Sequence, residues 1–158
     1  MKTMKFRNTF FAVICLMAVV LSSCGSDKDD DDSVTNNSIE VIVKHTSAKI
    51  SSFSGGTIIS VPKNDMLTYN KADFSLVVEN DGNVMLTKSY DVLPENSSFK
   101  FTQKSKKIQV VHTVNLLDDV SSENLTVDVV IKVNGSSVIT KTFQFDPEVP
   151  NTYIITLE

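Results

Sequence analysis

Tryptophan is absent from the chain, and cysteine occurs only twice in 158 residues. Both cysteines, Cys15 and Cys24, precede residue 39, where the part of the chain that we expect to fold begins. That part therefore contains no disulfide, no thiolate nucleophile and no cysteine ligand for a zinc site. Its roughly 120 residues are enough to bury a hydrophobic core without covalent support.

The chain also lacks the common sequence motifs of catalysis. It contains no Gly-x-Ser-x-Gly nucleophile turn, no Walker loop and no His-Glu-x-x-His zinc motif. Of its two histidines, His112 falls in phase with apolar neighbours and is predicted to be a hydrogen-bonded core residue, whereas His45 ends a predicted strand and is expected to be exposed. No spacing ties either to a carboxylate, so we predict no catalytic residue, no bound metal and no cofactor, with a two-histidine metal site as the alternative.

An excess of basic residues is missing as well. The formal net charge of −4 includes three basic residues near the N-terminus, and without them the chain has 12 basic and 19 acidic residues. Residues 27–32 hold five of those acids and one lysine, which leaves 11 basic and 14 acidic residues elsewhere, a net charge of −3. A mildly acidic domain with no basic stripe argues against nucleic acid as a partner.

The N-terminus has the three parts of a secretory signal. A basic beginning with Lys2, Lys5 and Arg7 is followed by an uninterrupted apolar run of 12 residues, Phe10 to Leu21, and then by small residues. Twelve residues are too few to span about 30 Å of hydrocarbon as a helix that rises about 1.5 Å per residue. We therefore interpret residues 1–23 as a signal peptide that is removed, rather than as a transmembrane helix.

Leu21-Ser22-Ser23-Cys24 resembles a bacterial lipobox. The resemblance implies that the Cys24 thiol receives a diacylglyceride, that the chain is cut just before it, and that Cys24 becomes the N-terminus. Two or three acyl chains hold a protein on a bilayer almost permanently, because each buried methylene contributes about 0.8 kcal/mol. The predicted attachment to the membrane is therefore through N-terminal lipid, with residues 24–38 as an acidic, flexible tether.

The tether resembles the export signal of surface lipoproteins of Bacteroidetes, which is a run of acidic residues close to the lipidated cysteine. The run from Asp27 to Asp32 is acidic except for Lys28. The resemblance implies an outer-membrane lipoprotein exposed at the cell surface, while the interruption by Lys28 keeps the periplasmic face open as the alternative. Asp32-Ser33-Val34 also resembles the short O-glycosylation motif of the same bacteria, which makes Ser33 a candidate glycosylation site.

Residues 39–158 are dominated by a period of two, which is the pattern of half-buried strands. Apolar residues alternate with polar ones in about eight or nine segments, without a convincing amphipathic helix. Asn80-Asp81-Gly82-Asn83 and Asn134-Gly135 are predicted to be hairpin turns, because Asn, Asp and Gly tolerate positive φ. The alternation also predicts one shared face for Phe74, Leu76 and Val78.

This number and spacing of short strands predict a single all-β domain, an antiparallel β-sandwich. The domain resembles the immunoglobulin-like or fibronectin type III-like sandwich in strand count and spacing over residues 39–158. The Cys…Trp…Cys hallmark of true immunoglobulin domains is absent, so no close relative is implied. A small closed barrel of the lipocalin-like kind is the alternative fold.

Sugar-binding modules stack flat aromatic rings on the ligand, and here only tyrosine and phenylalanine are present for that purpose. Tyr69, in the polar stretch from Asn64 to Asp73, is the best candidate for an exposed ligand contact. We expect a non-catalytic binding or structural module whose partner is an envelope protein or a glycan. The alternatives are a hydrolase inhibitor, a barrel for an apolar ligand, or a small surface hydrolase with paired carboxylates among Asp81, Asp91, Asp118 and Asp119.

Overall fold

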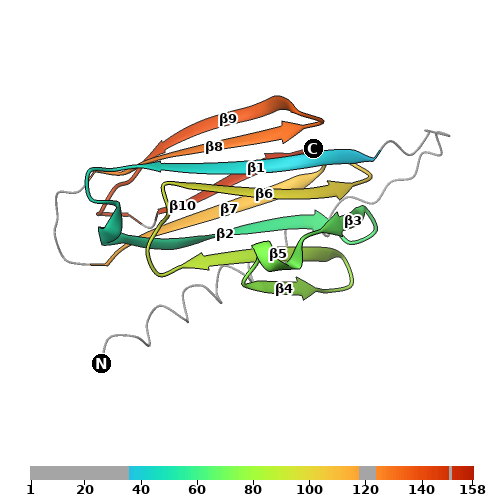
Figure 1. Ribbon diagram of the computed structural model, residues 1–158, viewed down its shortest axis with the longest axis horizontal. Helices are drawn as coiled ribbons and strands as arrows, with labels where there is room; N and C mark the ends of the chain where they lie inside the picture. The colour runs from blue at the N-terminus through green and yellow to red at the C-terminus, as the bar shows by residue number, and fades with distance from the viewer. Residues whose placement is uncertain (1–35, 118–123, 150) are drawn as a thin grey trace.

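The computed structural model describes residues 36–117, 124–149 and 151–158, which form two stacked β-sheets (Figure 1). Sheet A has five strands in the order β3-β6-β1-β8-β9, and sheet B has five in the order β10-β7-β2-β5-β4. All neighbouring strands are antiparallel. The strands are β1 (Asn37–Thr46), β2 (Phe53–Pro62), β3 (Met66–Tyr69), β4 (Leu76–Glu79), β5 (Asn83–Tyr90), β6 (Asn96–Gln103), β7 (Ile108–Leu116), β8 (Thr126–Val133), β9 (Ser136–Gln144) and β10 (Asn151–Leu157).

The predicted antiparallel β-sandwich is confirmed. Within the described residues each sheet is open and ends in an edge strand on either side, so the closed barrel is excluded. The described residues contain ten strands rather than eight or nine, and their helical segments are two 3₁₀ turns, η1 (Ile50–Ser52) and η2 (Lys71–Asp73). The additional strand is β3, which lies in a polar stretch for which the sequence predicts no strand.

The strand order shares part of the immunoglobulin arrangement. The neighbours β2-β5-β4 correspond to strands B, E and D of such a domain, and β3-β6 correspond to C and F. The first strand lies elsewhere, because β1 pairs with β6 and β8 in sheet A, and β7 takes the place beside β2. The chain therefore has a two-sheet sandwich whose connectivity differs from that of the immunoglobulin fold.

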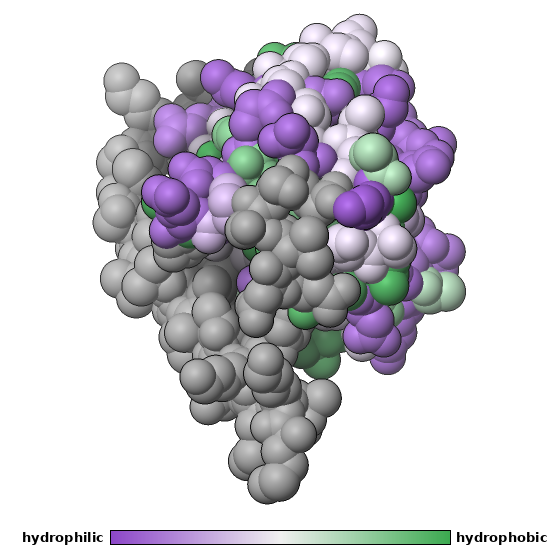
Figure 2. Space-filling model, turned by 90° about the vertical axis from the view of Figure 1, so that its left-hand side faces the viewer, coloured by the Kyte–Doolittle hydropathy of each residue, from purple (hydrophilic) through white to green (hydrophobic). Residues whose placement is uncertain are grey.

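The hydrophobic core fills the space between the two sheets. β1 contributes Ile39, Val41 and Val43, which have no exposed surface, while the residues between them face outward. β8 alternates in the same way, with every second residue buried. At the end of the sandwich that Figure 2 shows, hydrophilic residues are interspersed with residues of intermediate hydropathy and a few hydrophobic ones. The period of two in the sequence thus corresponds to one core face and one outward face along each of these strands.

β2 departs from this alternation, because it is buried on both faces from Phe53 to Val61. Ile59 belongs to the main core, whereas its neighbour Ile58 belongs to a second small cluster with Met85 and Val111. Successive side chains of a strand point to opposite faces, so this second cluster lies on the side of sheet B away from the core. β2 is also the central strand of sheet B, between β7 and β5.

The two predicted hairpin turns are present, but they are built differently. Asn134 (φ 53°) and Gly135 (φ 84°) both have positive φ and join β8 to β9, as a type I′ turn requires. In the turn between β4 and β5, Gly82 does not have positive φ. There the Asn80 side-chain Oδ1 accepts hydrogen bonds from the backbone N–H groups of Gly82 (3.0 Å) and Asn83 (2.7 Å). That turn is therefore set by an asparagine side chain rather than by glycine.

The predicted common face of Phe74, Leu76 and Val78 is present for Leu76 and Val78 but not for Phe74. Phe74 lies in the core, but it precedes the strand and follows η2. Inside the strand it is Val77 that packs on the core, while Leu76 is 47% exposed and Val78 packs on the second cluster.

No helix in the described part of the chain is long and apolar enough to cross a membrane.

Candidate functional site

The chain's two histidines meet inside the sandwich. β1 of sheet A carries His45 and β7 of sheet B carries His112, and their Nε2 atoms lie 3.0 Å apart. The ring centroids are 5.0 Å apart, with an angle of 37° between the planes. His45 is 2% exposed and His112 is fully buried. The prediction for His112 is confirmed, and the prediction that His45 is exposed is wrong.

Each ring has a second hydrogen bond on its other side. The Nδ1 of His45 lies 2.6 Å from the carbonyl oxygen of Pro94, and the Nδ1 of His112 lies 3.0 Å from the Oγ1 of Thr57. A carbonyl oxygen only accepts, so His45 carries its proton on Nδ1. Its Nε2 is then an acceptor, so the Nε2–H of His112 donates to it. The Nδ1 of His112 accepts in turn from the hydroxyl of Thr57, and all four groups are satisfied with both rings neutral.

Burial keeps both histidines neutral. It lowers the pKa of His45 below its usual value, although the hydrogen bond to Pro94 acts in the opposite direction. Burial, and to a smaller degree the nearby His45, lowers the pKa of His112 to about 3. A proton added to the Nε2 of His45 would bring two N–H groups together at the 3.0 Å contact, and a proton added to the Nδ1 of His112 would place a positive charge on a fully buried ring. The neutral form is therefore the one that fits the folded protein.

The pair links the two sheets by a hydrogen bond through the core. A zinc site takes at least three protein ligands. Among the described residues no three histidine, cysteine, aspartate or glutamate side chains lie close enough together to hold a metal ion. The outer nitrogens of the two rings are already occupied by Pro94 and Thr57. The arrangement is a polar link between β1 and β7 across an apolar core.

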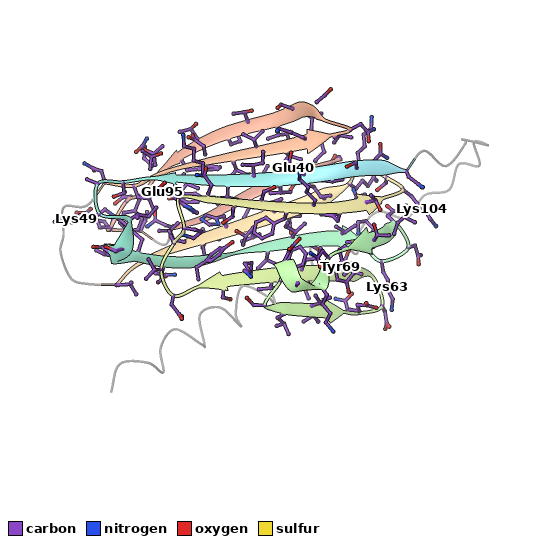
Figure 3. The ribbon with its side chains drawn as sticks, in the orientation of Figure 1. Glu40, Lys49, Lys63, Tyr69, Glu95 and Lys104 are labelled. Atoms are coloured by element: carbon purple, nitrogen blue, oxygen red, sulfur yellow. The ribbon has the colours of Figure 1, made fainter. Side chains whose placement is uncertain are left out.

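A second group of polar side chains lies on the outer face of sheet A (Figure 3). Glu40 on β1 faces Lys100 on β6 and Lys132 on β8, its direct partners in register, at 3.4 and 3.3 Å. The Ser98 hydroxyl donates to the same carboxylate at 3.0 Å. This hydrogen bond, and then the two lysines, lower the pKa of Glu40. The cluster ties three adjacent strands together on a solvent-exposed face, where such contacts contribute little to stability.

Tyr69 lies at the end of β3 and is half-buried (Figure 3). Its ring makes an edge-to-face contact with Phe74, with the centroids 6.3 Å apart, and Phe74 stacks on Phe99 at 5.6 Å. The ring therefore packs against the core, and the remainder of its surface faces solvent. Its role as a ligand contact stays a prediction.

The other predicted sites are only partly covered by the structure. Cys24 and Ser33 lie outside the described residues, as do Asp118 and Asp119. Asp81 lies in the turn between β4 and β5, and Asp91 follows β5, and both are exposed. Sequence spacing does not bring His45 and His112 together either, because 67 positions separate them and only the strand order places β1 over β7.

The fold has a counterpart among solved structures. The crystal structure of a DUF4425 family protein from Bacteroides ovatus ATCC 8483 has a similar fold. It superposes on this chain with a TM-score of 0.51, and the match covers 78% of this chain and 94% of that chain. The two sequences are 8% identical over the match, so the similarity is one of fold. No protein-family model matches the chain. No curated protein matches it by sequence.

Proposed function

We propose that the chain is a non-catalytic, lipid-anchored module on the outer membrane, presented at the cell surface, where it binds an envelope protein or a glycan. The observation that carries the proposal is the order of features before the first strand. A signal-like segment, the lipobox resemblance at Cys24 and an acidic run that ends at Asp32 are followed, after four more residues, by β1 at Asn37. The fold neighbour from Bacteroides supports it, because the acidic signal resembles that of surface lipoproteins of Bacteroidetes.

The tether has a length suited to this role. Twelve residues lie between Cys24 and Asn37, and the thirteen steps of an extended chain span at most about 3.5 Å each, or about 45 Å in total. A tether of that maximum length would let the sandwich clear the headgroups of the bilayer while staying near the surface. The acidic residues repel one another and favour an extended tether.

The test of the anchor is the substitution Cys24→Ser, with Cys15→Ser as the matched control in the signal segment. We expect the first variant to lose incorporation of labelled fatty acid and to leave the membrane fraction, and the second to behave as the unsubstituted chain. Mass spectrometry of the N-terminal peptide should show acylated Cys24. Acylation that persists in the Cys24→Ser variant would overturn the proposal.

The test of surface exposure uses the acidic run. Replacing Asp29 to Asp32 by alanine should retain the lipid but protect the domain from protease added to intact cells, whereas replacement by glutamate should keep it accessible. If the unsubstituted protein is fully protected in intact cells, the module faces the periplasm.

The candidate glycosylation site is tested separately. Ser33→Ala should remove any added glycan, which would be measured as a loss of mass in the peptide that contains residue 33.

A further inference from the structure

The two sheets end in four edge strands, β3 and β9 in sheet A and β10 and β4 in sheet B. An edge strand exposes unpaired backbone N–H and C=O groups that can pair with another chain. Proteins prevent this pairing with short edge strands, bulges, prolines or charged side chains, above all lysine. An edge strand without any of these features is therefore available as an interaction surface.

Three of the four edges carry such features. β3 has four residues and a register shift between Met66 and Thr68. β4 also has four residues and ends in Glu79. β9 carries Lys141, and its pairing with β8 shifts in register at Ile131 and Lys132.

β10 carries none of them. Its seven residues, Asn151–Leu157, include no charged residue and no proline, and they pair with β7 through seven consecutive partners without a shift. The opposite edge of β10 has no neighbouring strand among the described residues. The strand is also firmly seated, because Tyr153 stacks on Phe143 of β9 with ring centroids 4.4 Å apart. Ile154, at its centre, is 58% exposed, more than any other large hydrophobic residue described.

The outward-facing residues of β10 are self-complementary. About Ile154 the outward-facing residues read Thr152, Ile154, Thr156, which is the same in both directions. If a second β10 lay antiparallel with a two-fold axis at Ile154, Ile154 would face its own copy and Thr152 would face the copy's Thr156. Apolar groups would then meet apolar groups and hydroxyl groups would meet hydroxyl groups, which are favourable cross-strand pairs. No like charges would be placed opposite each other.

We propose that a second copy of this chain pairs with β10 in this register, so that two copies of sheet B form one continuous sheet. The inference goes beyond the proposed function and does not depend on the anchor or on the identity of a ligand. A single strand pair buries less surface than a stable interface in solution, so the dimer is expected to form most readily where copies are concentrated.

Disulfide trapping in cells that express the full chain tests the register. Residues directly opposite in an antiparallel pair have Cα atoms about 4.5 to 5.5 Å apart, which lies within the range that a disulfide bridges. When a thiol oxidant is added to the cells to take up the two electrons, Ile154→Cys should therefore give a covalent dimer that the unsubstituted chain, with its own Cys15 and Cys24, does not give. Thr152→Cys alone and Thr156→Cys alone should not give one, but cells that express both should give the mixed dimer.

Three outcomes would overturn the proposal: no dimer with Ile154→Cys, an equal amount of dimer with Thr152→Cys alone, or a cross-link to a chain of different mass, which would identify another protein as the occupant. Ile154→Lys in both partners should abolish the mixed cross-link, because it places like charges opposite each other. Val138→Lys on β9, at a position 46% exposed, is the control and should leave it intact. The membrane and soluble fractions of the cells are analysed separately for the covalent dimer. A chain found in the soluble fraction indicates failure of the anchor, whereas a chain that stays monomeric in either fraction indicates failure of the dimer.

Discussion

The Nε2 atoms of His45 and His112 lie 3.0 Å apart, and this contact joins the two sheets through their interior. The surrounding core is built mainly from aliphatic and aromatic side chains. In such surroundings a polar group costs free energy unless it is hydrogen-bonded, and here the carbonyl of Pro94 and the hydroxyl of Thr57 complete the chain of bonds. The pair therefore fixes how β1 lies over β7, in addition to the non-directional packing of the core.

Stability should fall as the pH is lowered below about 6.5, the usual pKa of histidine. The unfolded chain takes up protons there, while burial lowers the pKa of both histidines in the folded chain, that of His112 to about 3. Since the unfolded state then binds more protons, the free energy of unfolding should decrease with falling pH, with a slope that approaches about 1.4 kcal/mol per pH unit for His112 well below pH 6.5. His45 adds to the slope in the same direction. Urea unfolding between about pH 7.5 and about pH 5.5, above the range where carboxylates titrate, measures this slope.

The double variant His45→Leu with His112→Leu is the control for the pH effect, and it should lose the slope in this range. His112→Leu alone leaves the Nε2 of His45 as a buried acceptor without its donor, which costs about 1 to 3 kcal/mol. The double variant should be less destabilised than the sum of the two single variants, because the histidines interact directly. Equal slopes in the double variant and the unsubstituted chain would contradict this account.

Gly55 on β2 should not tolerate a side chain. A Cβ atom there would lie 2.1 Å from the backbone oxygen of Thr113 and 3.2 Å from the Cδ2 of Leu93. Because a backbone oxygen on the adjacent strand cannot move aside easily, Gly55→Ala should destabilise the protein by about 3 kcal/mol or more. Gly82→Ala is the matched control, since its Cβ would meet nothing closer than 3.9 Å, and it should change stability by less than about 0.5 kcal/mol. Thermal unfolding that ranks the two variants equally would be inconsistent with the close approach.

Asn134 should stabilise the protein in two separable ways. It adopts a positive φ of 53°, and its side chain accepts a hydrogen bond from the N–H of Ser38 (2.9 Å) and donates one to the Oδ1 of Asn37 (3.2 Å). Asn134→Gly keeps the backbone conformation and loses the side-chain bonds, at a cost of about 1 kcal/mol. Asn134→Ala also has to pay for the left-handed conformation and should cost about 2 kcal/mol. Denaturant unfolding of both variants separates the two contributions. An equally small loss of unfolding free energy in both variants would show that the left-handed conformation costs alanine nothing extra at this position.

Tyr69 can be tested for a structural role apart from a ligand contact. Its ring packs edge-to-face on Phe74, so Tyr69→Ala should destabilise the protein by about 2 kcal/mol, whereas Tyr69→Phe keeps the ring and should be close to neutral. A glycan array run with the Tyr69→Phe variant then reports the hydroxyl group alone. Binding that is lost in the phenylalanine variant at unchanged stability would assign Tyr69 to a ligand site.

The sequence predicts best the elements whose signals are local. The stripe along β8, the returning β9 and the Asn134-Gly135 turn between them follow from alternation and turn chemistry within about twenty residues, and all three are present. β3 is different, because Met66 to Tyr69 has little pattern of its own and is a strand through its pairing with β6. The face predicted for Phe74 is wrong because Phe74 lies between η2 and β4 and reaches the core from there, on the side opposite to Leu76 and Val78.

The histidine pair could not be predicted for a related reason. Alternation assigns His112, in the middle of its strand, to a buried face. His45 lies near the end of β1, and whether the end of a strand is exposed or buried depends on what covers it. For His45 the cover is the segment around Pro94, whose neighbour Glu95 also accepts a hydrogen bond from the backbone N–H of His45 at 2.8 Å. Only the three-dimensional order of the strands supplies that information.

The position of β1 in the middle of sheet A has a mechanical consequence. Starting at Asn37, β1 is held by eight residue pairs to β6 on one side and by eight to β8 on the other. A pull applied from the N-terminal side runs along the strand, perpendicular to these hydrogen bonds, so that both rows share the load in shear instead of opening one bond at a time. A chain held at its N-terminus in flowing liquid would thus transmit the force into the strand that is hardest to peel away.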